Sequence, residues 1–173
     1  MIPPPSPVTF SPVSSRDYPR IREMALRIWS EAYREIISEE QMHYMIERMY
    51  SSKVIANEVK SDGIRYQWIL EASEPVGYLA FGPVEPRKPC TLQKLYLLPN
   101  RHGKGIGSAT LKWLFQTLRE ASVPDLNLRV NRQNEAAIRC YERNGFQTIA
   151  EDCLDIGHGY VMDDFIMRLS LNP

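Results

Sequence analysis

The sequence has no excess of charge of either sign, because its 173 residues include 21 basic and 21 acidic side chains. A neutral domain has no overall field that would attract nucleic acid or an anionic membrane surface. No apolar run approaches the ~18 residues that a membrane-spanning helix requires. We therefore expect no nucleic acid and no membrane among the partners of this protein.

Cysteine is also scarce. Cys90, Cys140 and Cys153 are the only cysteines in the sequence, and neither a CxxC pattern nor His-paired metal spacing occurs. Residues 1–7 lack the basic start and the apolar stretch of a secretory signal peptide. These features predict reduced thiols, no metal site and a cytoplasmic location.

What the sequence does contain is material for one ordinary globular domain. Hydrophobic residues make up 43% and charged residues 24% of the chain, a balance typical of proteins with a packed core. Residues 1–7 are rich in proline and are expected to form a loose tail. Residues 8–173 are expected to form a single domain.

The spacing of apolar residues predicts the elements of that domain. Apolar residues recur at helical spacing in segments 21–28, 42–49 and 111–118, and residues 38–41 place a capping box before the second of these. Strands are predicted from Val8 onward and at 66–71, 76–81, 92–98, 126–130, 146–154 and 161–169. Strands interleaved with helices predict an α/β or α+β fold with a mixed sheet.

A glycine-rich turn follows the predicted strand at 92–98. It leads directly into a predicted helix, so backbone N–H groups can approach an anion without a Cβ in the way. Basic side chains within the same turn add positive potential. The glycines are Gly103, Gly105 and Gly107, and the basic residues are Arg101, His102 and Lys104.

Two common nucleotide motifs do not fit this turn. The phosphate-loop pattern GxxxxGK[ST] fails because Lys104 is followed by Gly105, and the dinucleotide pattern GxGxxG fails on the glycine spacing. A nucleotide-binding regulator is therefore a weak hypothesis. A glycine-rich turn without any ligand stays open as an alternative on this segment alone.

A second segment, residues 131–146, points to the same region of the fold. Asn134, Ala137, Ile138 and Tyr141 share one face of a predicted helix. The seven residues from Asn134 to Tyr141 span roughly 10 Å at the helical rise. Gly145 is placed to end this helix. Taken alone, Tyr141 reads as a packed core tyrosine.

Together these two segments resemble the GNAT superfamily of N-acetyltransferases. Residues 102–107 resemble its Q/R-x-x-G-x-G/A signature, with His102 where Gln or Arg is usual. Residues 131–146 resemble its N-x-x-A-x-x-x-Y-x-x-x-G-F segment. The resemblance covers about residues 8–171, and segments 29–38 and 155–167 resemble a bacterial branch of polyamine (spermidine/spermine) acetyltransferases.

The resemblance implies a fold, a cofactor and an assembly. The implied sheet is mostly antiparallel, has six to seven strands, splays between strands four and five and is flanked by about four helices. The implied cofactor is acetyl-CoA, and family members often form homodimers. The residues implied to bind the cofactor are Leu95, Tyr96 and Leu97 on a bulged fourth strand, then His102, Gly103, Lys104, Gly105, Ile106, Gly107, Ser108, Asn134 and Tyr141.

The resemblance also implies direct transfer of the acetyl group, with no acyl-enzyme intermediate. Backbone N–H groups near Leu97 would stabilise the oxyanion. Tyr141, whose phenol is protonated at neutral pH, suits the general acid. Cys140 is expected to point to another surface and to be structural. The general base stays open among Glu35, Glu71, Asp155 and Asp163.

The acceptor is expected to be a small molecule with a primary amine. By resemblance its site lies between the segment near Tyr33–Ser38 and the segment near Asp155–Asp163. Tyr33, Glu35, Asp155 and Asp163 would there surround a cationic amine such as a polyamine. Two alternatives remain: an acetyltransferase for protein N-termini or lysines, and a non-catalytic sensor that binds acyl-CoA.

Overall fold

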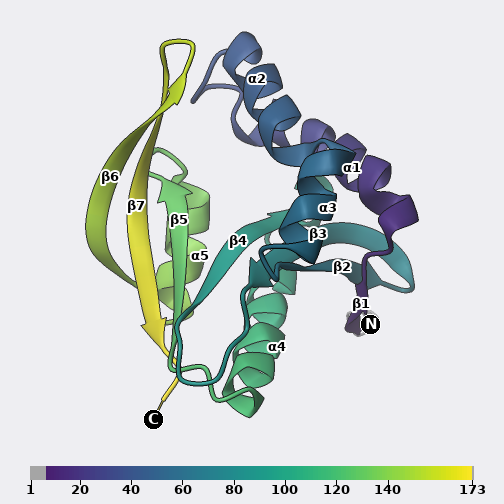
Figure 1. Ribbon diagram of the computed structural model, residues 1–173, viewed down its shortest axis with the longest axis vertical. Helices are drawn as coiled ribbons and strands as arrows, with labels where there is room; N and C mark the ends of the chain where they lie inside the picture. Colours follow the sequence, from purple (N-terminus) through teal and green to yellow (C-terminus); the bar gives the residue numbers. More distant parts are fainter. Residues whose placement is uncertain (1–6, 173) are drawn as a thin grey trace, which may run out of the picture.

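The computed structural model describes residues 7–172. Within them a single sheet is covered by helices on both faces (Figure 1). Five α-helices are formed: α1 Tyr18–Ala32, α2 Glu39–Tyr50, α3 Ser52–Lys60, α4 Ile106–Glu120 and α5 Glu135–Arg143. The seven strands are β1 Val8–Pro12, β2 Arg65–Glu71, β3 Glu74–Gly82, β4 Cys90–Leu97, β5 Asp125–Asn131, β6 Gln147–Gly157 and β7 Tyr160–Ser170.

The sheet has the order β1-β2-β3-β4-β5-β7-β6. All neighbours are antiparallel except β4 and β5, which are parallel. These two strands pair only through Cys90–Leu126, Thr91–Asn127 and Leu92–Leu128, and then separate. The mixed, mostly antiparallel sheet and its splay between strands four and five confirm the predicted fold.

Local signals explain where most helices begin and end. The Ser38 side chain accepts a hydrogen bond from the Gln41 N–H at 3.1 Å, as the capping box predicts. At the end of α5, the Gly145 N–H donates to the Glu142 carbonyl, and Gly145 has a positive φ of 94°. A positive φ at this position is readily adopted by glycine, which therefore ends the helix as predicted.

The structure contains one helix that was not predicted, and it has the β-bulge of β4 at a different residue. Helix α3 was not predicted, because it buries only Ile55 and so shows little apolar periodicity. Its sequence signal is Ser51, whose side chain caps the Val54 N–H. The predicted bulge at Leu95–Leu97 was also misplaced. The register between β3 and β4 shifts at Gln93, whereas residues 95–97 pair regularly with β3.

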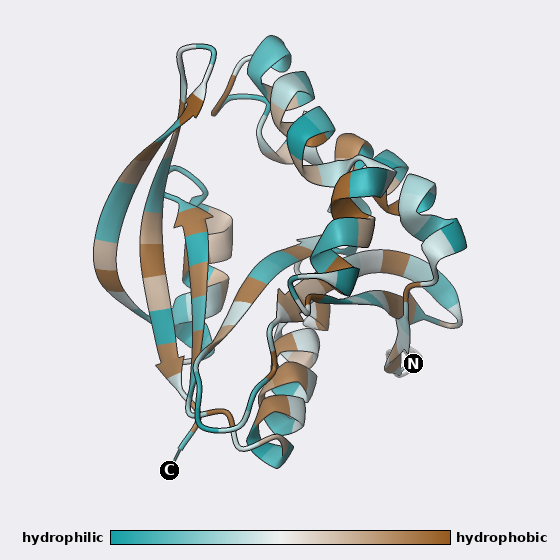
Figure 2. Ribbon diagram, viewed as in Figure 1, coloured by the Kyte–Doolittle hydropathy of each residue, from teal (hydrophilic) through white to brown (hydrophobic). Residues whose placement is uncertain are grey.

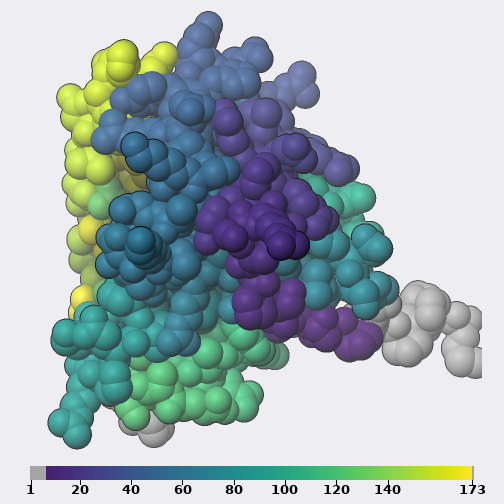
Figure 3. All heavy atoms as spheres, turned by 45° about the vertical axis from the view of Figure 1, so that its right-hand side comes forward, coloured from purple at the N-terminus to yellow at the C-terminus, as the bar shows by residue number. Residues whose placement is uncertain are grey.

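Apolar side chains form two cores, one on each face of the sheet. One core joins α4 and the end of α5 to the sheet, and the other joins α1, α2 and α3 to β2, β3 and β4. Figure 2 shows α4 with apolar and polar residues on different sides. In Figure 3, α1 to α3, coloured purple to blue, form the surface over one side of the molecule. The splay of β4 from β5 therefore lies between two packed layers.

Two expectations concern the ends of the chain and the membrane. Most of the proline-rich tail, residues 1–6, lies outside the described residues, as does residue 173. The division into a tail and a domain over residues 8–173 therefore stays a prediction. Among residues 7–172, no helix combines the length and apolar character needed to cross a membrane.

Candidate active site

The separation of β4 from β5 opens into a cavity of about 700 Å³, within the usual range for small-molecule sites. Its walls come from α1, α2, β4, β5, α5, β7 and the turn between β4 and α4. Segments that are far apart in the sequence, including both motifs of the sequence analysis, therefore meet around one space.

One end of the cavity is built to bind an anion. Gly103 and Gly105 have φ angles of 72° and 77°, and a Cβ on either would meet open space. Gly105 is the N-cap of α4, so the N–H groups of Ile106, Gly107 and Ser108 have no intrahelical acceptor. Unpaired N–H groups and the helix dipole attract negative charge. Of the turn and helix residues that were predicted to bind the cofactor, all except Lys104 line the cavity: His102, Gly103, Gly105, Ile106, Gly107 and Ser108.

The charges around this turn differ from the sequence-based expectation. Arg101 lines the cavity, but its Nε lies 3.2 Å from a Glu71 carboxylate oxygen, so its charge is partly neutralised. Lys104 is exposed and does not line the cavity. Arg139 and Arg143 of α5 do line it and were not predicted. Their spacing of four residues on one helix is the signal that could have identified them.

Strand β4 presents backbone groups to the cavity. The Leu98 N–H donates to the Val76 carbonyl of β3 at 2.9 Å. Because successive residues of a strand point their backbone groups to opposite sides, those of Leu97 face away from β3, toward the gap. The His102 Nε2 atom lies 3.1 Å from the Leu97 carbonyl oxygen. The N–H of Leu97 is thus placed to meet a ligand.

A glycine permits this arrangement from behind. Gly77 of β3 lies opposite Leu97. A Cβ at Gly77 would clash with the Tyr96 carbonyl oxygen and approach the Leu97 Cδ2 atom at 2.7 Å. Strands β3 and β4 can therefore approach this closely only because residue 77 has no side chain.

Three tyrosines meet in the middle of the cavity. Tyr33 follows the last turn of α1, Tyr96 lies on β4 and Tyr141 lies on α5, and all three line the wall. The Tyr33 and Tyr96 hydroxyls are 3.2 Å apart. Burial raises the pKa of Tyr141 above its ordinary value, and the neighbouring Tyr33 adds to the rise. The Tyr141 phenol is therefore protonated at neutral pH and able to donate.

Asn134 and Cys140 are the other α5 residues at the wall. Asn134 is the N-cap of α5, and its side-chain oxygen accepts from the Ala137 N–H at 3.3 Å. Cys140 lines the same cavity as Tyr141, which corrects the expectation that it points to another surface. Burial raises the pKa of the Cys140 thiol. A protonated thiol is a poor nucleophile, so a structural role for Cys140 is retained.

The four predicted carboxylates do not reach the cavity wall. Glu35 and Asp155 are exposed, Glu71 pairs with Arg101, and Asp163 pairs with Arg132 at 2.9 Å. Of the predicted acceptor residues, only Tyr33 lines the cavity. Roles for Glu35, Asp155 and Asp163 at its outer mouth stay predictions.

A different carboxylate lies in the wall. Asp164 is 3% exposed and lines the cavity. Its Oδ2 atom lies 3.2 Å from the Nε of Arg129 on β5. Burial raises the pKa of Asp164, and Arg129 partly offsets this rise. Sequence reasoning missed both residues, although Asp164 lies inside segment 155–167, which carries part of the family resemblance.

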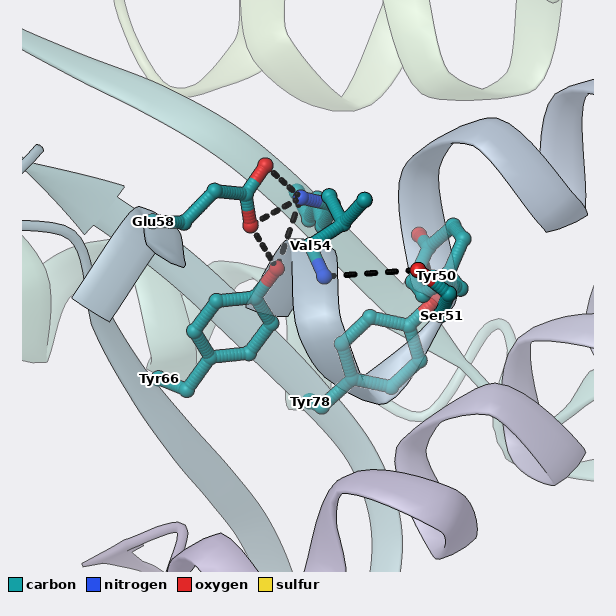
Figure 4. Close-up of polar contacts among 7 residues, drawn as sticks. Tyr50, Ser51, Val54, Glu58, Tyr66 and Tyr78 are labelled. Atoms are coloured by element: carbon teal, nitrogen blue, oxygen red, sulfur yellow. Dashed lines mark hydrogen bonds and ion pairs between the residues drawn. The ribbon is translucent and has the colours of Figure 1, made fainter. Parts of the chain in front are cut away.

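A buried polar cluster that includes Lys94 joins β4 to α3. Lys94 is 4% exposed, and its Nζ lies 3.1 and 3.0 Å from the two carboxylate oxygens of Glu58. The Tyr66 hydroxyl accepts from Nζ at 2.7 Å and donates to Glu58. Figure 4 shows Glu58 and Tyr66 meeting there. The Tyr78 hydroxyl donates a further hydrogen bond to the Tyr50 hydroxyl at 2.7 Å. The charge of Lys94, which also lines the cavity, is thus neutralised by Glu58.

Helix α2 contacts the β6–β7 hairpin across the cavity. The Tyr44 hydroxyl and the Arg48 guanidinium both donate to the Ile156 carbonyl, at 2.6 and 2.8 Å. The Gln41 side chain donates to the Val161 carbonyl at 3.0 Å. Figure 1 shows the tip of this hairpin beside α2. These bonds hold together helix α2 and the hairpin, which form two walls of the cavity.

The assembled site combines an anion cradle, exposed strand N–H groups, a protonated phenol and one buried carboxylate. No cluster of three or more His, Cys, Asp or Glu side chains suited to a metal ion occurs among residues 7–172. The open turn, the free N–H groups of α4 and the two arginines of α5 fit the pyrophosphate of coenzyme A. Such a site can position an acyl thioester against an amine.

Comparison with known proteins gives independent evidence. Residues 22–146 match the Acetyltransferase (GNAT) family. The chain is 26% identical over 155 residues to a spermidine N(1)-acetyltransferase of Thermoplasma acidophilum, covering 87% of this chain and 92% of that protein.

Solved structures agree with this match. The PaiA N-acetyltransferase of Thermoplasma acidophilum, in complex with coenzyme A, superposes with a TM-score of 0.78 at 26% identity, over 95% of this chain and 99% of that one. The spermidine N-acetyltransferase of Vibrio cholerae, in complex with CoA and spermine, gives a TM-score of 0.68 at 14% identity over 95% of each chain. At that identity the second likeness shows the fold alone.

Proposed function

The chain belongs to the GNAT acetyltransferase family and is an acetyl-CoA-dependent N-acetyltransferase, and from this premise we propose that its acceptor is a small primary amine. Polyamines are the first class to test. The observation that carries this proposal is the cavity wall, where a buried carboxylate, Asp164, lines the same space as the aromatic side chains of Tyr33, Tyr96 and Tyr141. Aromatic faces and a carboxylate suit an ammonium group. The relative that acts on spermidine supports the same class.

We propose the following roles for the residues at the donor end. The turn 103–107 and the first N–H groups of α4 hold the pyrophosphate. The gap-facing N–H of Leu97 stabilises the oxyanion of the tetrahedral intermediate. Tyr141 donates a proton to the departing thiolate, which its elevated pKa permits. Acetyl-CoA supplies the activated acyl group.

Assembly and location complete the proposal. The edge strand β6 is exposed along most of its length and offers a surface for a homodimer. Cys90, Cys140 and Cys153 are all free thiols. Free thiols accord with a reducing, cytoplasmic environment.

A turnover assay tests the acceptor. Purified protein with acetyl-CoA and a panel of amines, including spermidine, spermine, n-butylamine and N-terminal peptides, should release coenzyme A and form an acetylated small amine detectable by mass spectrometry. Acetylation of the peptides alone would reject the small-amine acceptor. Binding of acetyl-CoA by calorimetry without turnover of any amine would favour the sensor alternative.

A further inference from the structure

Asp164 is distinguished from every other carboxylate by its place in the fold. Among the described residues that line the cavity it is the only acidic side chain. It lies on β7 between Asn131 of β5 and Asp152 of β6. The preceding residue, Asp163, has a side chain that is 42% exposed and pairs with Arg132. Adjacent strand residues point to opposite sides, so the two aspartates have different environments.

The charge of Asp164 is only partly compensated. Arg129 is the one side chain within residues 7–172 that hydrogen-bonds it, through Nε at 3.2 Å. The same guanidinium also donates from Nη1 to Asp152 at 2.8 Å. One positive charge is thus shared between two carboxylates. A net negative charge remains at this place in the wall, with lone pairs of Asp164 available to a donor.

The surroundings of Asp164 suit an ammonium group near the reaction centre. Its charge acts on Tyr33, because it adds to the rise in the Tyr33 pKa that burial causes. Tyr33 in turn lies beside Tyr96, and it also acts on Tyr141. The Asp164 carboxylate therefore acts electrostatically on the group of three tyrosines that includes Tyr141, the proposed general acid. Lys94, which also lines the cavity, is neutralised by Glu58.

We propose that Asp164 binds the ammonium group of the acceptor and takes one of its protons, so that the neutral amine can attack. This inference rests on the proposed function. Asp164 receives the first nitrogen proton and later releases it to solvent. As the C–N bond forms and the C–S bond breaks, Tyr141 gives its proton to the thiolate sulfur. The second nitrogen proton then replaces the one that Tyr141 gave.

The test compares Asp164→Asn with Asp62→Asn, an exposed aspartate after α3 that does not line the cavity, using acetyl-CoA and spermidine or whichever amine the wild type acetylates fastest. We expect kcat/KM for the amine to fall about 10²-fold or more in Asp164→Asn. In Asp62→Asn it should stay within about twofold. Acetyl-CoA affinity, measured by calorimetry, should be unchanged in both and shows that the variants are folded.

The pH profile separates a base from a merely structural residue. The groups that act electrostatically on Asp164 or feel its charge are Arg129 on β5, Asp152 on β6, the adjacent Asp163 on β7 and Tyr33 at the end of α1. In the wild type, kcat/KM for the amine should fall at low pH as Asp164 becomes protonated, which gives the profile an acidic limb, and should level off above that limb. In Asp164→Asn, kcat/KM should instead rise about tenfold per pH unit toward the amine pKa, near 10.4 for an alkylamine, because only free neutral amine reacts. Arg129→Gln should keep the acidic limb but move it to higher pH, since Arg129 lowers the pKa of Asp164.

Each outcome decides the inference. If the wild type acetylates an amine and Asp164→Asn keeps its rate and acidic limb, Asp164 is not the base. If Arg129→Gln loses the acidic limb as completely as Asp164→Asn, Asp164 acts only by positioning Arg129. If the wild type acetylates no amine at all, it is the proposed function that fails.

Discussion

The Tyr33 hydroxyl lies 3.2 Å from the Tyr96 hydroxyl, which joins the end of α1 to β4 beside the splay of the sheet. Both rings also pack near Trp29, with centroids at 4.9 Å for Tyr33 and 5.7 Å for Tyr96. The ring contacts hold the side chains in place without the hydrogen bond. The hydroxyl pair is therefore available to orient an acceptor.

Tyr33→Phe should raise the KM of the amine roughly 3- to 10-fold, the effect of one lost hydrogen bond. The ring should stay packed, so acetyl-CoA affinity and melting temperature should hold. Tyr50→Phe is the matched control, because Tyr50 is buried, bonds to Tyr78 and does not line the cavity. It should lower stability without changing KM. Equal kinetic effects of the two variants would contradict a role for Tyr33 in acceptor binding.

Tyr141→Phe should lower kcat about 10²-fold or more, because the thiolate loses its proton donor. The ring should keep its contact with Phe146, at a centroid distance of 5.5 Å, so the fold should persist. Steady-state kinetics with calorimetric acetyl-CoA binding tests this. An unchanged kcat with full binding would show that water protonates the thiolate and that Tyr141 only packs.

The buried Lys94–Glu58 pair predicts an asymmetric loss of stability. Glu58→Gln leaves the ammonium of Lys94, which is 4% exposed, without a counter-charge and should cost about 3–5 kcal/mol. Lys94→Met leaves Glu58, which is 24% exposed, partly hydrated and should cost less. Urea unfolding measures both.

The surface pair Lys88–Glu85 is the control for this comparison. Glu85→Gln should change the free energy of unfolding by no more than about 1 kcal/mol. If Lys94→Met proved the more harmful of the two buried changes, the ammonium would be stabilised by something other than Glu58.

Gly77 and Gly107 predict opposite effects of the same substitution. Gly77→Ala should cost about 1–3 kcal/mol, because the new methyl group overlaps the backbone of β4. Gly107→Ala lies in the first turn of α4, where its Cβ would meet the Cys140 sulfur at an ordinary 3.5 Å. It should keep or raise the melting temperature while weakening acetyl-CoA binding. Thermal unfolding measures the stability of the two variants, and calorimetry measures their acetyl-CoA affinity. A lower melting temperature for Gly107→Ala than for Gly77→Ala would contradict this prediction.

The sequence predicted the elements that follow from local pattern. Alternating or helical spacing located the strands and most helices within a few residues, and the two motifs led to the family. Helix α3 escaped because a short helix that buries one residue has almost no periodic signal. Gly77 escaped because its importance depends on how closely β4 approaches, which only the folded sheet determines.

The choice between Asp163 and Asp164 shows where sequence reasoning ends. Strand alternation predicts that the two side chains point to opposite sides. Which of them faces the cavity depends on the register of β7 between β5 and β6, and register is a property of the whole sheet. Arg139 and Arg143 were hidden for a related reason. Their position near the glycine turn depends on how α5 packs against α4.

The splay of β4 from β5 gives this sheet an edge in its interior. An open edge at the rim of a sheet can pair with another protein and so favours aggregation. Here the gap lies between packed layers and beneath the hairpin that α2 holds, where a slender extended molecule fits and a foreign strand does not. The cofactor can then be regarded as the missing part of the sheet. Acetyl-CoA should thus slow hydrogen exchange at Leu95 and Leu97, as a neighbouring strand does elsewhere.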